Sequence, residues 1–126
     1  MIRARRFIVV VDDDESVRDS LPSLLKMLGF DAVSFASAEA FLASNALDRA
    51  DCLIFDVAMP GIGGLELVRQ PLVRSAGVPV IFITALHDGD VRRELLNAGP
   101  VGCLLKPFSE DQILEALDIA LDRGRH

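Results

Sequence analysis

Five residues with chemically useful side chains stand at the ends of apolar runs in the sequence. Asp12 and Asp13 follow the first run, Asp56 ends the third, and Thr84 and Lys106 stand at the ends of the last two. Carboxylates that lie close together repel one another unless a positive group lies among them. Mg²⁺ suits such a cluster, because it binds through one or two carboxylates, water and phosphate oxygens. A carboxylate can also attack phosphorus and form an aspartyl phosphate, so this set of residues favours phosphoryl-transfer chemistry.

That chemistry suggests a role for each residue type. A metal ion and hydrogen-bond donors must neutralise the charge on the transferred phosphoryl group. The Thr84 hydroxyl and the compact Lys106 ammonium each suit one of its oxygens. Asp56 alone emerges from a central run, which makes it the candidate phosphoacceptor. Asp12 and Asp13 are then the candidate metal-site acids.

Each of these residues also has a purely structural interpretation. The acidic run 12–15 is typical of a helix N-terminus, where it complements the helix macrodipole. Asp56 suits a turn before Met59–Gly61, Thr84 suits a strand, and Lys106 suits an exposed surface. The functional interpretation therefore depends on the fold bringing all of them to one place.

Apolar runs that alternate with segments of helical periodicity predict an α/β fold. The expected strands span about 7–11, 31–35, 52–56, 79–84 and 101–105. Most of these runs are continuous rather than alternating, which is typical of strands covered on both faces of a parallel sheet. Five such βα units predict one doubly wound (βα)5 sheet in a three-layer sandwich, as a single domain of residues 1–126. In such a sheet the site lies outside the carboxyl ends of the strands, where the five residues stand.

Three of the expected helices have recognisable ends. Gly29 ends a first helix, and Ser37 caps a short second one. Ser109 and Gln112 have the spacing of a capping box at the start of the last helix.

Two prolines and one further segment complete the helix predictions. Pro22 fits the first helix if that helix starts late enough to place it in the first turn. Pro71 should kink or shorten a third helix that spans 65–73. The spacing of Val91, Leu95 and Leu96 predicts a fourth helix.

The composition is that of an ordinary globular domain. The 126 residues are 51% hydrophobic and 25% charged, with a formal net charge of −6. Direct nucleic-acid binding is not expected, because it needs a basic surface to neutralise phosphates. No apolar run approaches the roughly 20 residues of a membrane span, and the N-terminus does not resemble a signal peptide. We therefore expect a cytoplasmic protein without membrane contact, with Cys52 and Cys103 as reduced, buried thiols.

Four segments together resemble the receiver domains of two-component response regulators, in the CheY-like superfamily. They occur in the family's order and spacing and cover essentially the whole chain; they are Val9–Arg18, Leu53–Leu67, Val80–Ala85 and Lys106–Phe108. The details are most similar to receivers of FixJ/LuxR-type transcription regulators, which are fused to a helix-turn-helix DNA-binding domain.

The resemblance implies a flavodoxin-like fold with sheet order 2-1-3-4-5 and a signalling function. A histidine kinase would transfer a phosphoryl group from its phosphohistidine to Asp56. The modified domain would then control an output domain or partner protein, in this subgroup through transcription. A receiver of this kind assists only its own phosphorylation and dephosphorylation, so no enzyme activity on other substrates is expected.

The resemblance also implies a ligand set. Mg²⁺ would be held by Asp13, Asp56 and the backbone carbonyl of Ala58, with Asp12 assisting through water.

By the same resemblance, Thr84 and Lys106 would bind the phosphoryl oxygens. The peptide bond between Lys106 and Pro107 would be cis, which is uncommon even before proline.

The fifth strand departs from the family's pattern. Three residues before Lys106 the family usually has an aromatic ring that moves inward on phosphorylation, and Cys103 stands there. The residue before the lysine is often acidic, and here it is Leu105. These changes make the face of the fourth helix, fifth strand and fifth helix more apolar. We expect a partner or homodimer surface there, since exposed apolar patches often mark interfaces.

The sequence argues against two other functions and leaves a third as the alternative to a phosphoacceptor module. A phosphatase of the haloacid dehalogenase type needs a second acid two residues after its nucleophile, where Ala58 stands, and a cap region for which 126 residues leave no room. A flavodoxin-like cofactor site would place a phosphate against the acids of residues 12–14 instead of backbone donors. A degenerate receiver that binds a partner without phosphorylation remains as the alternative, because of the altered fifth strand.

Overall fold

A five-stranded parallel sheet forms the centre of the molecule. The computed structural model describes residues 5–85, 93, 97 and 102–123. Within them the strand order is β2-β1-β3-β4-β5, and the four neighbouring pairs are all parallel. The strands are β1 (Phe7–Val11), β2 (Asp31–Phe35), β3 (Cys52–Asp56), β4 (Val80–Thr84) and β5 (Gly102–Leu105). The predicted doubly wound, flavodoxin-like α/β fold is therefore confirmed, and β4 begins one residue later than expected.

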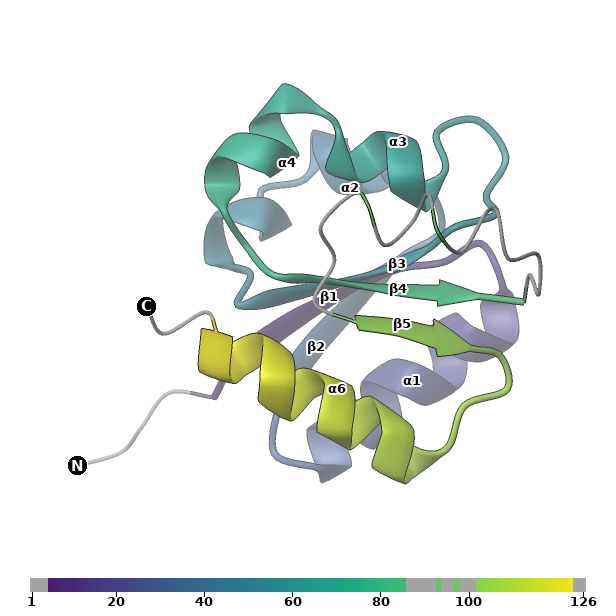
Figure 1. Ribbon diagram of the computed structural model, residues 1–126, viewed down its shortest axis with the longest axis vertical. Helices are drawn as coiled ribbons and strands as arrows, with labels where there is room; N and C mark the ends of the chain where they lie inside the picture. The colour runs from purple at the N-terminus through teal and green to yellow at the C-terminus, as the bar shows by residue number, and fades with distance from the viewer. Residues whose placement is uncertain (1–4, 86–92, 94–96, 98–101, 124–126) are drawn as a thin grey trace.

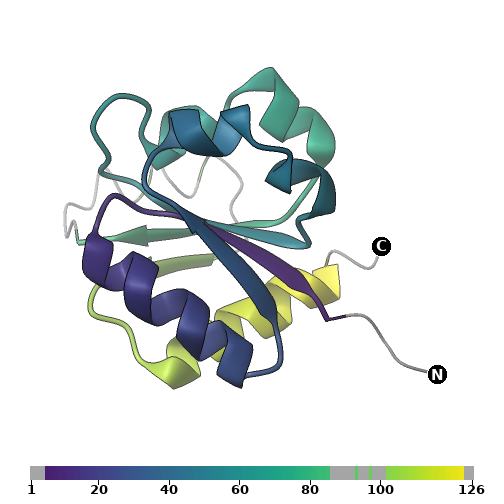
Figure 2. The same cartoon turned by 180° about the vertical axis from the view of Figure 1, so that it is seen from behind.

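Helices cover both faces of the sheet (Figures 1 and 2). One face is covered by α1 (Glu15–Met27) and α6 (Glu110–Arg123). The other is covered by α2 (Ala38–Ala43), the 3₁₀ helix η1 (Ala46–Arg49), α3 (Gly64–Val68) and α4 (Pro71–Ala76). The result is the expected three-layer sandwich.

The two cores explain why the strands read as continuous apolar runs. Along β1, Ile8 and Val10 pack in the core beneath α1 and α6, while Val9 and Val11 pack in the core on the opposite face. All five residues of β3 and of β4 are buried, as expected for strands in the middle of a covered sheet.

Helix α1 begins earlier than its proline suggested. The Asp14 side chain caps it by accepting a hydrogen bond from the Ser16 N–H, so the helix starts at Glu15. Pro22 therefore lies in the helix interior, because the helix does not start late enough to place it in the first turn. Its ring is buried on α1 together with Leu21 and Leu25, so tertiary packing outweighs the lost backbone hydrogen bond.

The predicted third helix is divided in two. Helix α3 ends at Val68, and α4 begins at Pro71, which takes the first position of the new helix. Proline is favoured there because its missing N–H would have no helical partner. The interruption that Pro71 predicted is confirmed, although it produces a second helix rather than a bend.

The other helix ends agree with the sequence. The Ser37 hydroxyl accepts from the Ala40 N–H, and Ser109 and Gln112 exchange the two hydrogen bonds of a capping box. The helix predicted around Val91 to Leu96 lies outside the described residues. Among the helices that are described, none is long and apolar enough to span a membrane.

Candidate functional site

The carboxyl ends of four strands bring the five predicted residues to one edge of the sheet. Asp12 and Asp13 follow β1, Asp56 is the last residue of β3, and Thr84 is the last residue of β4. Lys106 follows β5, and its backbone N–H donates to the Thr84 carbonyl at 2.8 Å. Parallel strands end at the same edge, so residues up to 94 positions apart in sequence become neighbours.

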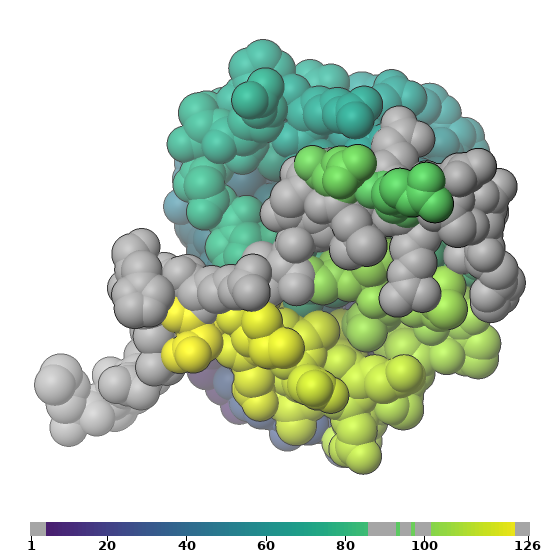
Figure 3. All heavy atoms as spheres, viewed as in Figure 1, coloured from purple at the N-terminus to yellow at the C-terminus, as the bar shows by residue number. Residues whose placement is uncertain are grey.

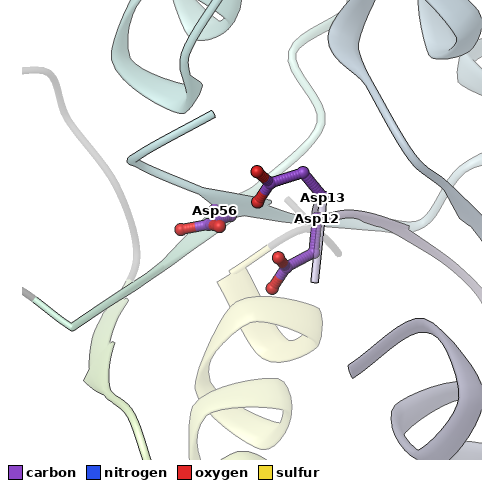
Figure 4. Close-up of side chains that lie close together, drawn as sticks. All are labelled: Asp12, Asp13 and Asp56. Carbon is purple, nitrogen blue, oxygen red and sulfur yellow. The ribbon is translucent and has the colours of Figure 1, made fainter. Parts of the chain in front are cut away.

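Three carboxylates meet at this edge (Figure 4). Asp12, Asp13 and Asp56 each offer an oxygen, and these oxygens lie within 4.8 Å of one another. Asp12 and Asp56 are buried, whereas Asp13 is exposed. Such a group of hard oxygen donors, open to water on one side, suits a divalent cation that keeps some of its water ligands.

Among the residues that the structure describes, Lys106 provides the positive charge that pairs with the cluster. Its Nζ lies 3.0 Å from Asp12 Oδ2 and 3.5 Å from Asp56 Oδ2. The Asp12 side chain is completely buried, yet its Oδ2 accepts no hydrogen bond from any described residue and is compensated by the ammonium charge alone. A buried oxygen without a hydrogen-bond donor is costly, so the site has acceptor capacity that fits a metal ion or its bound water.

Backbone and side-chain hydrogen bonds fix the orientation of the acids. Asp12 Oδ1 accepts from the Asp14 N–H at 2.9 Å, and Arg18 donates from Nη1 to the Asp12 carbonyl at 3.1 Å. Asp56 Oδ1 accepts from the Ala58 N–H at 3.2 Å. The Asp56 oxygen that faces Lys106 is Oδ2.

The electrostatic environment shifts two of these groups. Burial and the neighbouring Asp12 carboxylate raise the pKa of Asp56 to about 7. Burial by itself lowers the pKa of Lys106, but the Asp12, Asp56 and Asp14 carboxylates together raise it above its ordinary value. Without a metal ion, the site thus holds a permanent ammonium beside two acids that compete for it.

The other predicted residues lie around this centre. Thr84 is 2% exposed, directly beside the Lys106 backbone. The peptide bond between Lys106 and Pro107 is cis, as expected. Ala58 is exposed and lies two residues beyond Asp56.

The two residues that depart from the family pattern lie on β5. Cys103 pairs in register with Phe82 and packs against the core on the α2 side. It is half-buried, so the prediction of a buried thiol is right for Cys52 and wrong for Cys103, which lies on an edge strand. Leu105 pairs in register with Thr84 and is 36% exposed. In the space-filling view, α6 and the segment leading into it form one continuous surface (Figure 3).

Two features of the site were not predicted. A groove of about 530 Å³ adjoins the acids between α1 and the segment after β5, and its lining includes Val17, Leu24, Lys106 and Phe108. Glu39, on α2, accepts a hydrogen bond from the backbone of the loop that follows Asp56. No sequence pattern links Glu39 to that loop, because the two partners are 23 residues apart.

Residues 8–118 match the family of response regulator receiver domains. The chain belongs to this family. Receiver domains are signalling modules of two-component systems.

Individual relatives support the same assignment. The chain is 35% identical over 121 residues to nodulation protein W of Bradyrhizobium diazoefficiens, covering 96% of this chain and 53% of that protein. It is 41% identical over 116 residues to the transcriptional regulatory protein FixJ of Azorhizobium caulinodans, covering 91% and 54%. The structure of chemotaxis protein CheY4 from Vibrio cholerae is 28% identical with a TM-score of 0.84, covering 94% of this chain and 100% of that one.

The chain spans about half the length of the curated relatives that it matches. The similarity therefore concerns the receiver domain of those proteins.

Proposed function

We propose that this receiver domain is a phosphoacceptor module in which Asp56 takes a phosphoryl group from the phosphohistidine of a histidine kinase. The observation that carries the proposal is the position of the Asp56 carboxylate beside Asp12, Asp13 and Lys106. In the reaction an Asp56 oxygen forms a bond to phosphorus while the P–N bond to the imidazole breaks. The imidazole leaves with the bonding electron pair.

Receiver domains typically use Mg²⁺ at an acidic cluster, and the acids present here fit it. We propose that Asp13, Asp56 and the Ala58 carbonyl would hold the ion, with Asp12 assisting through water. When bound, Mg²⁺ would neutralise charge on the phosphoryl oxygens. The fit is supported by the Asp12 oxygen that accepts no hydrogen bond from the residues described, and by the short distances among the three carboxylates.

Thr84 and Lys106 complete the proposed site by binding the other phosphoryl oxygens. Lys106 suits this role because its ammonium already lies 3.5 Å from Asp56 Oδ2. A permanent cation at this distance favours the added negative charge of a phosphoryl group. Thr84 follows from its place at the end of the neighbouring strand, next to the Lys106 backbone.

The output is proposed from the relatives. FixJ is named a transcriptional regulatory protein, so we propose that this cytoplasmic domain, residues 1–126, controls transcription through an output domain or partner rather than by contacting nucleic acid itself. Leu105, exposed at the end of β5, and Cys103, at the position of the family's aromatic switch, belong to the proposed partner surface, which can also serve a homodimer. The alternative is a degenerate receiver that binds its partner without phosphorylation.

Intact mass spectrometry distinguishes the two. The protein is incubated with Mg²⁺ and acetyl phosphate, and we expect one added phosphoryl group on the wild type and none on Asp56→Asn. Asp48→Asn, which alters an exposed aspartate on η1, should be labelled like the wild type. An unlabelled wild type, under conditions that label another receiver, would leave the degenerate module; a labelled Asp56→Asn would mean that another residue is the acceptor.

A further inference from the structure

The loop that follows β3 lies against the proposed phosphoacceptor. This phosphoacceptor loop, residues 57–63, is fixed at its start by two hydrogen bonds. The Val57 N–H donates to the Ile83 carbonyl of β4 at 3.0 Å, and the Ala58 N–H donates to Asp56 Oδ1 at 3.2 Å. Met59 is buried in the core on the α2 side. The first half of the loop is therefore held by the sheet and the core.

The second half of the loop is held from a different element. The Ile62 N–H donates to Oε1 of Glu39, on α2, at 3.2 Å. Gly61, just before it, has a left-handed φ of +76°, and a Cβ there would lie 3.1 Å from the same oxygen. The carboxylate thus lies against the turn, and the left-handed φ of Gly61 makes glycine the favoured residue there.

The helix that carries Glu39 is itself firmly anchored. Ser37 caps its first turn. Phe41 is completely buried, and its ring contacts Phe35 of β2 and Phe55 of β3 with centroid separations of 5.8 and 5.7 Å. Phe55 immediately precedes Asp56. Glu39 therefore extends from a turn whose position is set by the same strand that ends in the phosphoacceptor.

We infer that Glu39 is a positioning residue of the phosphoacceptor site: its carboxylate, through the Ile62 N–H, holds the returning half of the loop that carries Ala58. The inference rests on the proposed function, since the Ala58 carbonyl is there a ligand of Mg²⁺. Loss of the hydrogen bond would leave the returning half of the loop held by the packing of Ile62 against the core and by the Gly64 N–H, which donates to the Val57 carbonyl at 3.3 Å. The weaker hold on this half would let the whole loop move more, and metal affinity would fall by the cost of holding the Ala58 carbonyl in place when the ion binds.

Two substitutions separate the hydrogen bond from the charge. Glu39→Gln removes the charge but keeps a side-chain oxygen that can accept from the Ile62 N–H. Glu39→Asp keeps the charge but shortens the side chain by one methylene and withdraws the acceptor from Ile62. Glu115→Asp is the matched control, because Glu115 is exposed on α6, which covers the opposite face of the sheet.

Three measurements test whether Glu39 holds the loop. Amide hydrogen exchange of Ile62 in metal-free protein reports the hydrogen bond itself. An NMR titration that follows the Ala58 amide gives the dissociation constant of Mg²⁺ without any phosphorylation. The rate of labelling by acetyl phosphate at subsaturating Mg²⁺ is a third readout, recorded well below the melting temperature of every variant.

For Glu39→Asp we expect faster exchange at Ile62, a Mg²⁺ dissociation constant raised by roughly two- to tenfold, and a proportionally slower labelling rate, as for the loss of one exposed hydrogen bond. Glu39→Gln and Glu115→Asp should behave like the wild type. Unchanged exchange at Ile62 in Glu39→Asp would overturn the inference, and so would faster exchange with unchanged Mg²⁺ affinity. Weaker Mg²⁺ binding in Glu39→Gln together with normal binding in Glu39→Asp would also overturn it, because the charge of Glu39 and not its hydrogen bond would then matter. An unlabelled wild type would instead contradict the proposed function, while the exchange and titration results would stand.

Discussion

Lys106 Nζ lies 3.0 Å from Oδ2 of Asp12, a carboxylate with no exposed surface. The distance from the same ammonium to Asp56 Oδ2 is longer, 3.5 Å. In the metal-free state the lysine therefore compensates chiefly the charge of Asp12 and is less tightly paired with Asp56, the proposed phosphoacceptor. This sharing of one cation between two acids has measurable consequences for stability.

Lys106→Met should destabilise the metal-free protein. It would leave Asp12 buried without a compensating charge, which we expect to lower the free energy of unfolding by about 1–3 kcal/mol at pH 7. Asp12→Asn in the same chain should recover most of that loss. Lys26→Met, at the only other lysine and an exposed position, is the control and should change stability little. Urea denaturation with a chelator present measures all four proteins; equal stability of Lys106→Met and wild type would contradict the pairing.

Asp56 should make the stability of the metal-free protein depend on pH. Its pKa, raised by burial and by Asp12 to about 7, lies above the ordinary 3.8, so folding disfavours the ionised form. Stability should therefore fall as the pH rises from about 4 to about 7. Asp56→Asn should be more stable than the wild type at pH 8, by about 1–3 kcal/mol, and little different at pH 4.

Thermal unfolding at several pH values, with and without Mg²⁺, measures this effect. Added Mg²⁺ should reduce the stability difference between Asp56→Asn and the wild type at pH 8, because the ion favours the ionised acids of the wild type. Asp48→Asn is the control and should show no such pH-dependent difference. A less stable Asp56→Asn at pH 8 would mean that Lys106 more than compensates the carboxylate.

Gly64→Ala should disturb the site more than its position at the start of α3 suggests. A Cβ on Gly64 would lie 2.5 Å from the backbone oxygen of Asp56, which cannot move away without displacing the acid. We expect a loss of about 1–3 kcal/mol in stability, as for an overpacked site, together with slower labelling by acetyl phosphate. Gly77→Ala is the comparison, because its φ of +67° strains an alanine while a Cβ there meets nothing within 4 Å. A similar stability loss with normal labelling in Gly64→Ala would contradict the effect on Asp56.

The two cysteines should differ in reactivity. Burial raises the pKa of the Cys52 thiol to about 12, so it carries almost no thiolate at neutral pH. Cys103 is half-buried on the edge strand β5. Native protein should therefore be alkylated by iodoacetamide at Cys103 first, and at both residues in denaturant, as peptide mass mapping would show. Preferential alkylation of Cys52 in the native state would contradict the structure.

Leu105→Glu should abolish any self-association that follows phosphorylation. Leu105 is exposed at the end of β5, and a carboxylate in an apolar contact would be costly to desolvate. Sedimentation velocity of phosphorylated and unphosphorylated protein measures the oligomeric state. Met27→Glu is the control, since Met27 is the most exposed large apolar residue of the described chain and lies at the far end of α1. A monomer under all conditions would exclude the homodimer and leave a separate partner for this surface.

Much of the fold could be predicted because short-range signals and tertiary packing agree. The continuous apolar runs identified all five strands, and the Ser37 and Ser109 caps identified two helix starts. Pro22 left the start of α1 open in the sequence, because its local cost is outweighed by burial that depends on the rest of the sheet. Helix propensity is a local property, whereas burial is decided only when distant segments meet.

The sequence by itself determined which residues could do chemistry and, from the strand order of its family, that Asp12, Asp13, Asp56, Thr84 and Lys106 share one edge. Only the tertiary structure decided how the charges are distributed among them: Lys106 is closer to Asp12 than to Asp56, and one Asp12 oxygen accepts no hydrogen bond from the described part of the chain. The attachment of Glu39 to the phosphoacceptor loop was also invisible in the sequence. Such contacts depend on distances of a few tenths of an ångström between segments far apart in the chain, and spacing along a sequence carries no information on that scale.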